Sequence, residues 1–187
     1  KRQPQMRDTH KVIKQLDLSE TKTKLLAIVA NERGAVEAFS YDQISYIGYP
    51  FSISENFQMR NTNTTIEESL LLLNRLVERA VCVNQELVVY LSMGFGNPYG
   101  DPWSPALVAD WVKRLVDIGV NRISISDTIG IAQADTIREL FEYLNMVHPG
   151  VFFGAHLHAK PNEAISKIKA AYVGGCRAFD SAIRGLG

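Results

Sequence analysis

Two histidines one residue apart, His156 and His158, lie in the apolar run "FFGAHLH", which has the composition of a buried strand. Side chains at positions i and i+2 of a strand point to the same face. Two imidazoles on one face can take adjacent positions around a divalent metal ion; the alternative is a hydrogen-bonded polar patch. The run then breaks at "AKPN", so we expect the pair at the carboxyl end of its strand.

A carboxylate stands at the end of the preceding apolar run, in the turn "SDTIG" from Ser126 to Gly130. At such a place Asp127 can accept a proton, bind a metal ion or cap the next helix, and the local pattern leaves these roles open. The hydroxyl of Thr128 is either structural or bonded to a substrate oxygen. We predict Asp127 as a catalytic candidate and Thr128 as a substrate-binding candidate.

Polar residues follow other apolar runs as well. Asn31 comes after the first run, and Ser92 opens a long loop rich in Gly and Pro, "SMGFGNPYGDPWSP". Loops of this length in a compact domain often carry function, although a wide surface turn explains the composition equally well. We expect Asn31 and Ser92 to contact substrate. The last run holds Asp180 and Ser181, and Arg184 precedes a Gly-Leu-Gly turn.

The elements that must position these residues alternate along the chain. Apolar runs typical of buried strands cover 24–30, 43–49, 86–94, 122–127, 151–158 and 178–183. Helical patterns cover 64–84, with Thr65 as a cap, 104–119, with Ser104 and Pro105 at its start, 133–148 and 162–175. Strict alternation of strand and helix indicates a parallel sheet covered by helices, either an open doubly wound sheet or a barrel.

The distribution of the polar residues favours a TIM (β/α)8 barrel. A barrel builds its site from the carboxyl ends of several strands, whereas an open sheet concentrates it at one switch point, usually beside a glycine-rich phosphate turn that this chain lacks. A complete barrel needs eight strands and about 250 residues. We therefore expect residues 1–187 to form one catalytic barrel domain with about six β/α units, incomplete at both ends.

Composition excludes several classes of partner. The chain has 20 basic and 20 acidic residues, so no net charge attracts nucleic acid. No run approaches the roughly 18 apolar residues of a membrane span, and the N-terminal residues lack the apolar run of a signal peptide. Cys82 and Cys176 lie far apart without CxxC spacing, which predicts free, buried thiols and a cytoplasmic location.

The chain resembles the 3-hydroxy-3-methylglutaryl-CoA lyase family, within the TIM-barrel metal-dependent lyases and Claisen-type synthases. The resemblance rests on two segments, "ISISDTIGIAQADTIREL" and "GAHLHAKPNEAISKIKAAYVGGCRAFDSAIRGLG". The likeness runs from "PQM" at Pro4 through "NERGAVEAF" and "TTIEESL" to Gly187. Its most specific parts are the SDTIG turn, the HxH strand and the "DSAIRGLG" end, in that order.

The resemblance implies a retro-aldol cleavage of a 3-hydroxyacyl-CoA to acetyl-CoA and a keto acid. It implies Mg²⁺ or Mn²⁺ on His156 and His158, with His156 or Asp127 assisting proton transfer. The family's other metal ligands, its catalytic arginine and its catalytic cysteine have no counterpart within the 187 residues. We therefore expect these residues alone to be inactive.

One departure and two alternatives accompany the resemblance. After the HxH pair the family usually has Asp-Thr-x-Gly, where this chain has Ala159, Lys160 and Pro161. Residues behind metal ligands tune their orientation, so the change bears on the choice of acyl-CoA more than on the metal. The alternatives are a Claisen-type synthase of the isopropylmalate or homocitrate kind and a metal-free, non-enzymatic barrel. A homodimer is left open.

Overall fold

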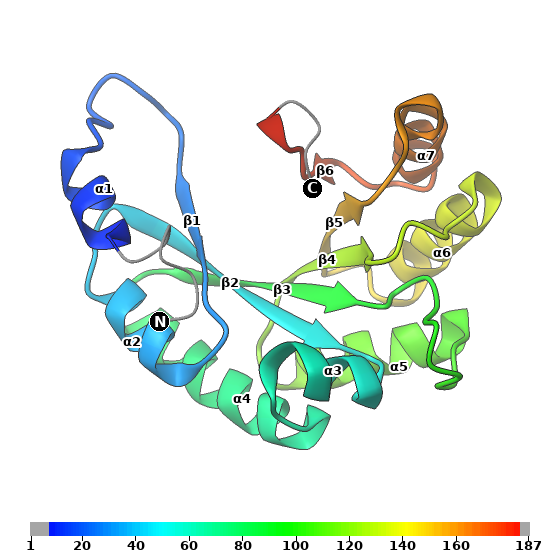
Figure 1. Cartoon of the computed structure of the whole chain (residues 1–187), viewed down its shortest axis with the longest axis horizontal. Coiled ribbons are helices and arrows are strands. Elements are labelled where there is room, and N and C mark those ends of the chain that lie inside the picture. The colour runs from blue at the N-terminus through cyan, green and yellow to red at the C-terminus, as the bar shows by residue number, and fades with distance from the viewer. Residues whose placement is uncertain (1–7, 184–187) are drawn as a thin grey trace.

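A single curled sheet organises the computed structural model, which describes residues 8–183 (Figure 1). Its six parallel strands pair in the order of the sequence. They are β1 (Leu25–Ile28), β2 (Ile44–Ser52), β3 (Glu86–Ser92), β4 (Arg122–Asp127), β5 (Phe152–Leu157) and β6 (Ala178–Phe179). Helices cover the outer, convex side. This is the incomplete TIM barrel that the alternating pattern predicts.

Seven helices are present in the described residues: α1 (Thr9–Gln15), α2 (Glu32–Phe39), α3 (Glu55–Thr62), α4 (Ile66–Cys82), α5 (Pro105–Asp117), α6 (Ala134–Val147) and α7 (Pro161–Val173). The last four confirm the predicted helices. Their caps are also as expected: Thr65 and Glu68 form a capping box before α4, and the Ser104 hydroxyl accepts from the Leu107 N–H before α5. The short helices α1 to α3 were not predicted.

The strand ends differ from the sequence expectation in one informative place. The prediction ends the second strand at Tyr49, but β2 continues through Pro50 to Ser52. Proline lacks an N–H and normally interrupts a central strand. Pro50 is tolerated because β1 pairs with β2 only as far as Gly48, while Pro50 faces Tyr90 of β3. The sixth strand is shorter than predicted, ending at Phe179.

The core lies between the sheet and the helices on its convex side. Each central strand sends large side chains into it, among them Tyr49, Phe51, Leu91 and Ile125, which are fully buried. This packing fixes the strands and leaves their carboxyl ends free to carry polar residues.

Two smaller predictions have separate outcomes. Both cysteines are free, but only Cys176 is buried, so the predicted burial of Cys82 was wrong. Within residues 8–183, no helix is long and apolar enough to cross a membrane.

Candidate active site

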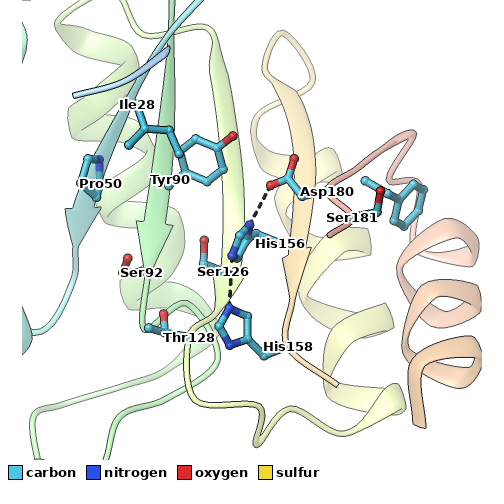
Figure 2. A pocket seen from close by; sticks show the side chains of 11 residues that line it. Ile28, Pro50, Tyr90, Ser92, Ser126, Thr128, His156, His158, Asp180 and Ser181 are labelled. Carbon is cyan, nitrogen blue, oxygen red and sulfur yellow. Dashed lines mark hydrogen bonds and ion pairs between the residues drawn. The ribbon is translucent and has the colours of Figure 1, made fainter. Parts of the chain in front are cut away.

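A cavity of about 490 Å³ opens on the concave side of the sheet, above the carboxyl ends of the strands (Figure 2). Four of the predicted site residues line it: Ser92, Thr128, His156 and His158. The other lining residues are Ile28, Pro50, Tyr90, Ser126, Phe179, Asp180 and Ser181. The cavity has the size of a small-molecule site and is built from all six described strands and the turns after them.

His156 of β5 and His158, which directly follows β5, converge in this cavity. Their Nε2 atoms are 3.2 Å apart, and His156 Nδ1 lies 2.8 Å from Asp180 Oδ2 (Figure 2). A carboxylate can only accept, so Nδ1 of His156 carries a proton, and in the neutral imidazole Nε2 then holds the lone pair and faces His158. A carboxylate behind a histidine is the usual arrangement around a metal-binding imidazole.

The donor set fits a divalent metal ion. Two nitrogen ligands at right angles, each about 2.1 Å from one ion, stand about 3 Å apart, which matches the separation of the two Nε2 atoms. Within residues 8–183, no group of three or more His, Cys, Asp or Glu side chains is arranged to hold a metal ion. The two histidines would thus supply two adjacent ligands to such an ion.

A tyrosine stands beside the histidine pair. The Tyr90 ring meets the His156 ring edge-on, with 5.6 Å between centroids. Burial, and secondarily the negative charge of Asp180, raises the pKa of Tyr90 to about 12. Its phenol therefore stays neutral at physiological pH and can donate a hydrogen bond to a bound oxygen.

Asp127 lies behind the cavity wall and is not among the residues that line it. Its side chain is 1% exposed, and its oxygens accept from the N–H groups of Ile131 and Ala132 and from Lys167 Nζ at 2.8 Å. Asn31 likewise lies outside the cavity lining, where its side chain caps α2 by accepting from the Gly34 N–H. The catalytic role of Asp127 and the substrate contact of Asn31 stay predictions.

The loop after β3 is tied down at several points. The Met93 N–H donates to Thr128 Oγ1 at 2.8 Å, and the Trp103 indole donates to the Gly94 carbonyl. Asp101 accepts from the Ser54 hydroxyl and from Asn56, and these bonds, with Ser54 foremost, hold the pKa of its carboxyl below the usual range. The loop is therefore held in place by the turn after β4 and by the start of α3, although none of its residues after Ser92 lines the cavity.

Some lining residues were missed by sequence reasoning although a signal was present. Tyr90 precedes Ser92 by two positions and Ser126 precedes Thr128 by two, so the strand period that identified the histidine pair also applies to them. Asp180 was noted as a polar strand-end residue, but its contact with His156 depends on how β6 lies beside β5. Arg184 lies outside the described residues.

Comparisons with known proteins agree on one family. The model of the HMGL-like family matches residues 3–187. Hydroxymethylglutaryl-CoA lyase of Pseudomonas mevalonii is 31% identical over 184 residues, which are 98% of this chain and 60% of that enzyme. The crystal structure of the HMG-CoA lyase from Brucella melitensis superposes with a TM-score of 0.87 at 27% identity, covering 98% of this chain and 64% of that one.

A third relative carries ligands. The HMG-CoA lyase from Acinetobacter baumannii was solved in complex with coenzyme A and 3-methylmalate; its TM-score is 0.87, at 23% identity over 98% of this chain and 59% of that one. At this identity the likeness establishes the fold. The chain spans about 60% of the length of these relatives.

Proposed function

Because this chain belongs to the HMGL-like family, we propose that the protein to which it contributes is a carbon–carbon lyase that cleaves a 3-hydroxyacyl-CoA to acetyl-CoA and a keto acid. The observation that carries the proposal is the histidine pair, whose Nε2 atoms stand 3.2 Å apart in a cavity at the carboxyl ends of the strands. The relatives that share nearly all of this chain are named as lyases of this kind.

His156 and His158 would hold the divalent metal, Mg²⁺ or Mn²⁺. When bound, such an ion acts as a Lewis acid on oxygens of the substrate. Asp180 orients His156 by accepting from Nδ1, and this contact also fixes which nitrogen is available as a ligand. Within residues 8–183, no third His, Cys, Asp or Glu side chain is arranged to join them around the ion.

The cleavage needs a base for the tertiary hydroxyl and an acid for the acetyl-CoA carbon left after the bond breaks. With Nε2 on the metal ion, the one proton that His156 can pass is the one on Nδ1, which lies 2.8 Å from Asp180 Oδ2, so we assign the proton movement to His156 acting through Asp180. Asp127 is the second candidate, acting from behind the cavity wall. The family's cysteine, which would serve as the acid, is not among the described residues.

The neutral hydroxyls in the lining would bind substrate oxygens. Tyr90 keeps its proton to about pH 12 and is a donor over the whole working range. Thr128 Oγ1 already accepts from the Met93 N–H, which leaves its own hydroxyl proton free to donate. Ser92 and Ser126 offer two further hydroxyls on the same wall. Coenzyme A in the Acinetobacter baumannii relative supports an acyl-CoA as the substrate class.

The test is metal-dependent formation of acetyl-CoA and acetoacetate from 3-hydroxy-3-methylglutaryl-CoA by the full-length protein. We expect His156→Ala and His158→Ala each to lower kcat by at least about 100-fold and EDTA to abolish turnover in the wild type. His10→Ala is the matched control, because His10 is exposed on α1, an element that contributes no residue to the cavity lining.

Different results would contradict different parts of the proposal. Full activity in either cavity variant would remove the metal role from the pair. Bound metal without turnover would point to another acyl-CoA or to the synthase alternative, which the lyase names of the relatives do not favour. The absence of metal binding in the full-length protein would favour the non-enzymatic barrel. A cytoplasmic location and a homodimer remain expectations of the same proposal.

A further inference from the structure

Lys167 is the one lysine of α7 that is buried. Its side chain is 5% exposed, whereas Lys169 on the same helix is exposed. Its ammonium has three N–H donors and three acceptors around it: Asp127 Oδ2 at 2.8 Å, the Gly130 carbonyl at 3.0 Å and the His158 carbonyl at 3.0 Å. A buried lysine is costly unless it is paired and hydrogen-bonded, and here every donor is used.

The three acceptors come from the two segments that form the floor of the cavity. Asp127 and Gly130 belong to the SDTIG turn, and His158 ends the HxH segment. The turn itself is compact: Asp127 accepts from the N–H groups of Ile131 and Ala132, and an added Cβ at Gly130 would lie 3.4 Å from the His158 carbonyl oxygen. Lys167 therefore holds together two segments that already touch.

We propose that Lys167 is a positioning residue for the metal-binding histidines. Its ammonium fixes the backbone of His158 against the SDTIG turn, so that the Nε2 atoms of His156 and His158 stay preorganised for one ion. Asp127 belongs to the same unit, as the charge that keeps the ammonium in place. This inference rests on the proposed function, because it concerns the residues that would hold the metal.

The experiment measures Mn²⁺ binding by calorimetry in the full-length protein, with no substrate and no turnover. Lys167→Met removes the ammonium and leaves Asp127 as an unpaired buried charge, which is strongly destabilising. The double variant Asp127→Asn/Lys167→Met removes both charges, a change that buried ion pairs tolerate much better. Lys169→Met is the matched control, with the same substitution on an exposed side chain of the same helix.

We expect the folded Lys167 variants to bind Mn²⁺ about tenfold more weakly, the range found when groups supporting metal ligands are removed. The control should match the wild type. We also expect faster amide hydrogen exchange at residues 156–160 in the metal-free double variant than in the metal-free wild type. This result would show, without any metal, that Lys167 holds the HxH segment in place. Unchanged affinity and exchange in a folded Lys167 variant would overturn this inference alone. A wild type that binds no Mn²⁺ would overturn the proposed function and this inference with it.

Discussion

His156 depends on a residue that is not itself a metal candidate. Asp180, which directly follows β6, accepts from Nδ1, and Ser124 Oγ lies 3.4 Å from the same carboxylate oxygen. The carboxylate both selects the tautomer and turns the ring toward the cavity. At the scale of single residues, the geometry of the site therefore depends on Asp180 as well as on the two histidines.

Replacing Asp180 with Asn keeps an acceptor for Nδ1 but removes the charge. We expect Asp180→Asn to weaken Mn²⁺ binding by the full-length protein about tenfold, because the supporting carboxylate makes the imidazole a better ligand. Ser181→Ala, at the next position in the same lining, should leave the affinity unchanged. Calorimetry measures the Mn²⁺ affinity of both variants. An equal loss of affinity in the two would mean that any change in the segment 180–181 weakens binding, and that the charge of Asp180 has no special role.

Asp101 gives a prediction in pH. Its hydrogen bonds with Ser54 and Asn56 lower its pKa below the ordinary value of 3.8. A carboxyl with a depressed pKa in the folded state stabilises the fold above its unfolded value and loses that contribution as the pH falls through the folded value. Asp101→Asn should therefore lower the melting temperature at pH 7, and the difference from wild type should shrink below about pH 4. A difference that is constant from pH 7 to pH 3 would contradict this.

At the residue scale, the sequence predicted correctly those side chains whose common placement follows from the spacing within a single strand. His156 and His158 lie two positions apart, so the strand period alone places them on one face. Lys167 was not identified, because its partners are 40, 37 and 9 positions away and meet only through the packing of α7 on the sheet. Long-range contacts of this kind have no local pattern.

At the scale of elements, the SDTIG turn links β4 to the HxH segment by close backbone approach. Gly130 has a φ of +72°, which disfavours any side chain, and a Cβ there would also press on the His158 carbonyl. Gly100 has a similar φ of +78° but open space around the Cβ position. Alanine substitutions at the two glycines therefore distinguish the cost of the left-handed backbone, which both share, from the cost of the steric contact, which arises only at Gly130.

Both glycine-to-alanine changes should cost about 1 kcal/mol from the left-handed backbone. Gly130→Ala should cost more than Gly100→Ala and should also weaken Mn²⁺ binding, because only at Gly130 does the added methyl displace the HxH segment. Urea unfolding and metal titration of both variants test this. Equal free energies of unfolding and equal affinities would show that the contact is harmless.

The predictability of the elements follows their length and their caps. Helices α4 to α7 are long, and α4 and α5 begin with residues that cap by side chain, so periodicity and capping identify them together. Helices α1 to α3 have seven or eight residues each, too few for a reliable period, and Gly34 further weakens the pattern of α2. Strand β2 was underestimated because Pro50 resembles a terminator.

At the scale of the whole molecule, the sheet is open along both outer strands. Within residues 8–183, β1 pairs only with β2, and β6 pairs only with β5. Apolar side chains are left exposed near these strands, including Ile28 on β1 and Ile165 and Ile168 on α7. In a closed barrel such surfaces are covered by neighbouring β/α units.

This openness gives a direct prediction for residues 1–187 as an isolated polypeptide. We expect no lyase turnover from it, because within residues 8–183 only two adjacent histidines are offered to the metal. We also expect it to bind a hydrophobic dye and to self-associate through its unpaired strands. The full-length protein is the control. Measurable turnover by the 187 residues would refute the reading of the site as incomplete.

The pairing order of the sheet has a consequence for synthesis on the ribosome. From β2 onward, each described strand pairs with the strand just before it in the chain, so an emerging polypeptide can add each of these strands to an edge that already exists. The histidine strand would then dock on a β4 already anchored by the earlier units. Lys167 emerges after it, so the ammonium would join the two segments only once both were in place.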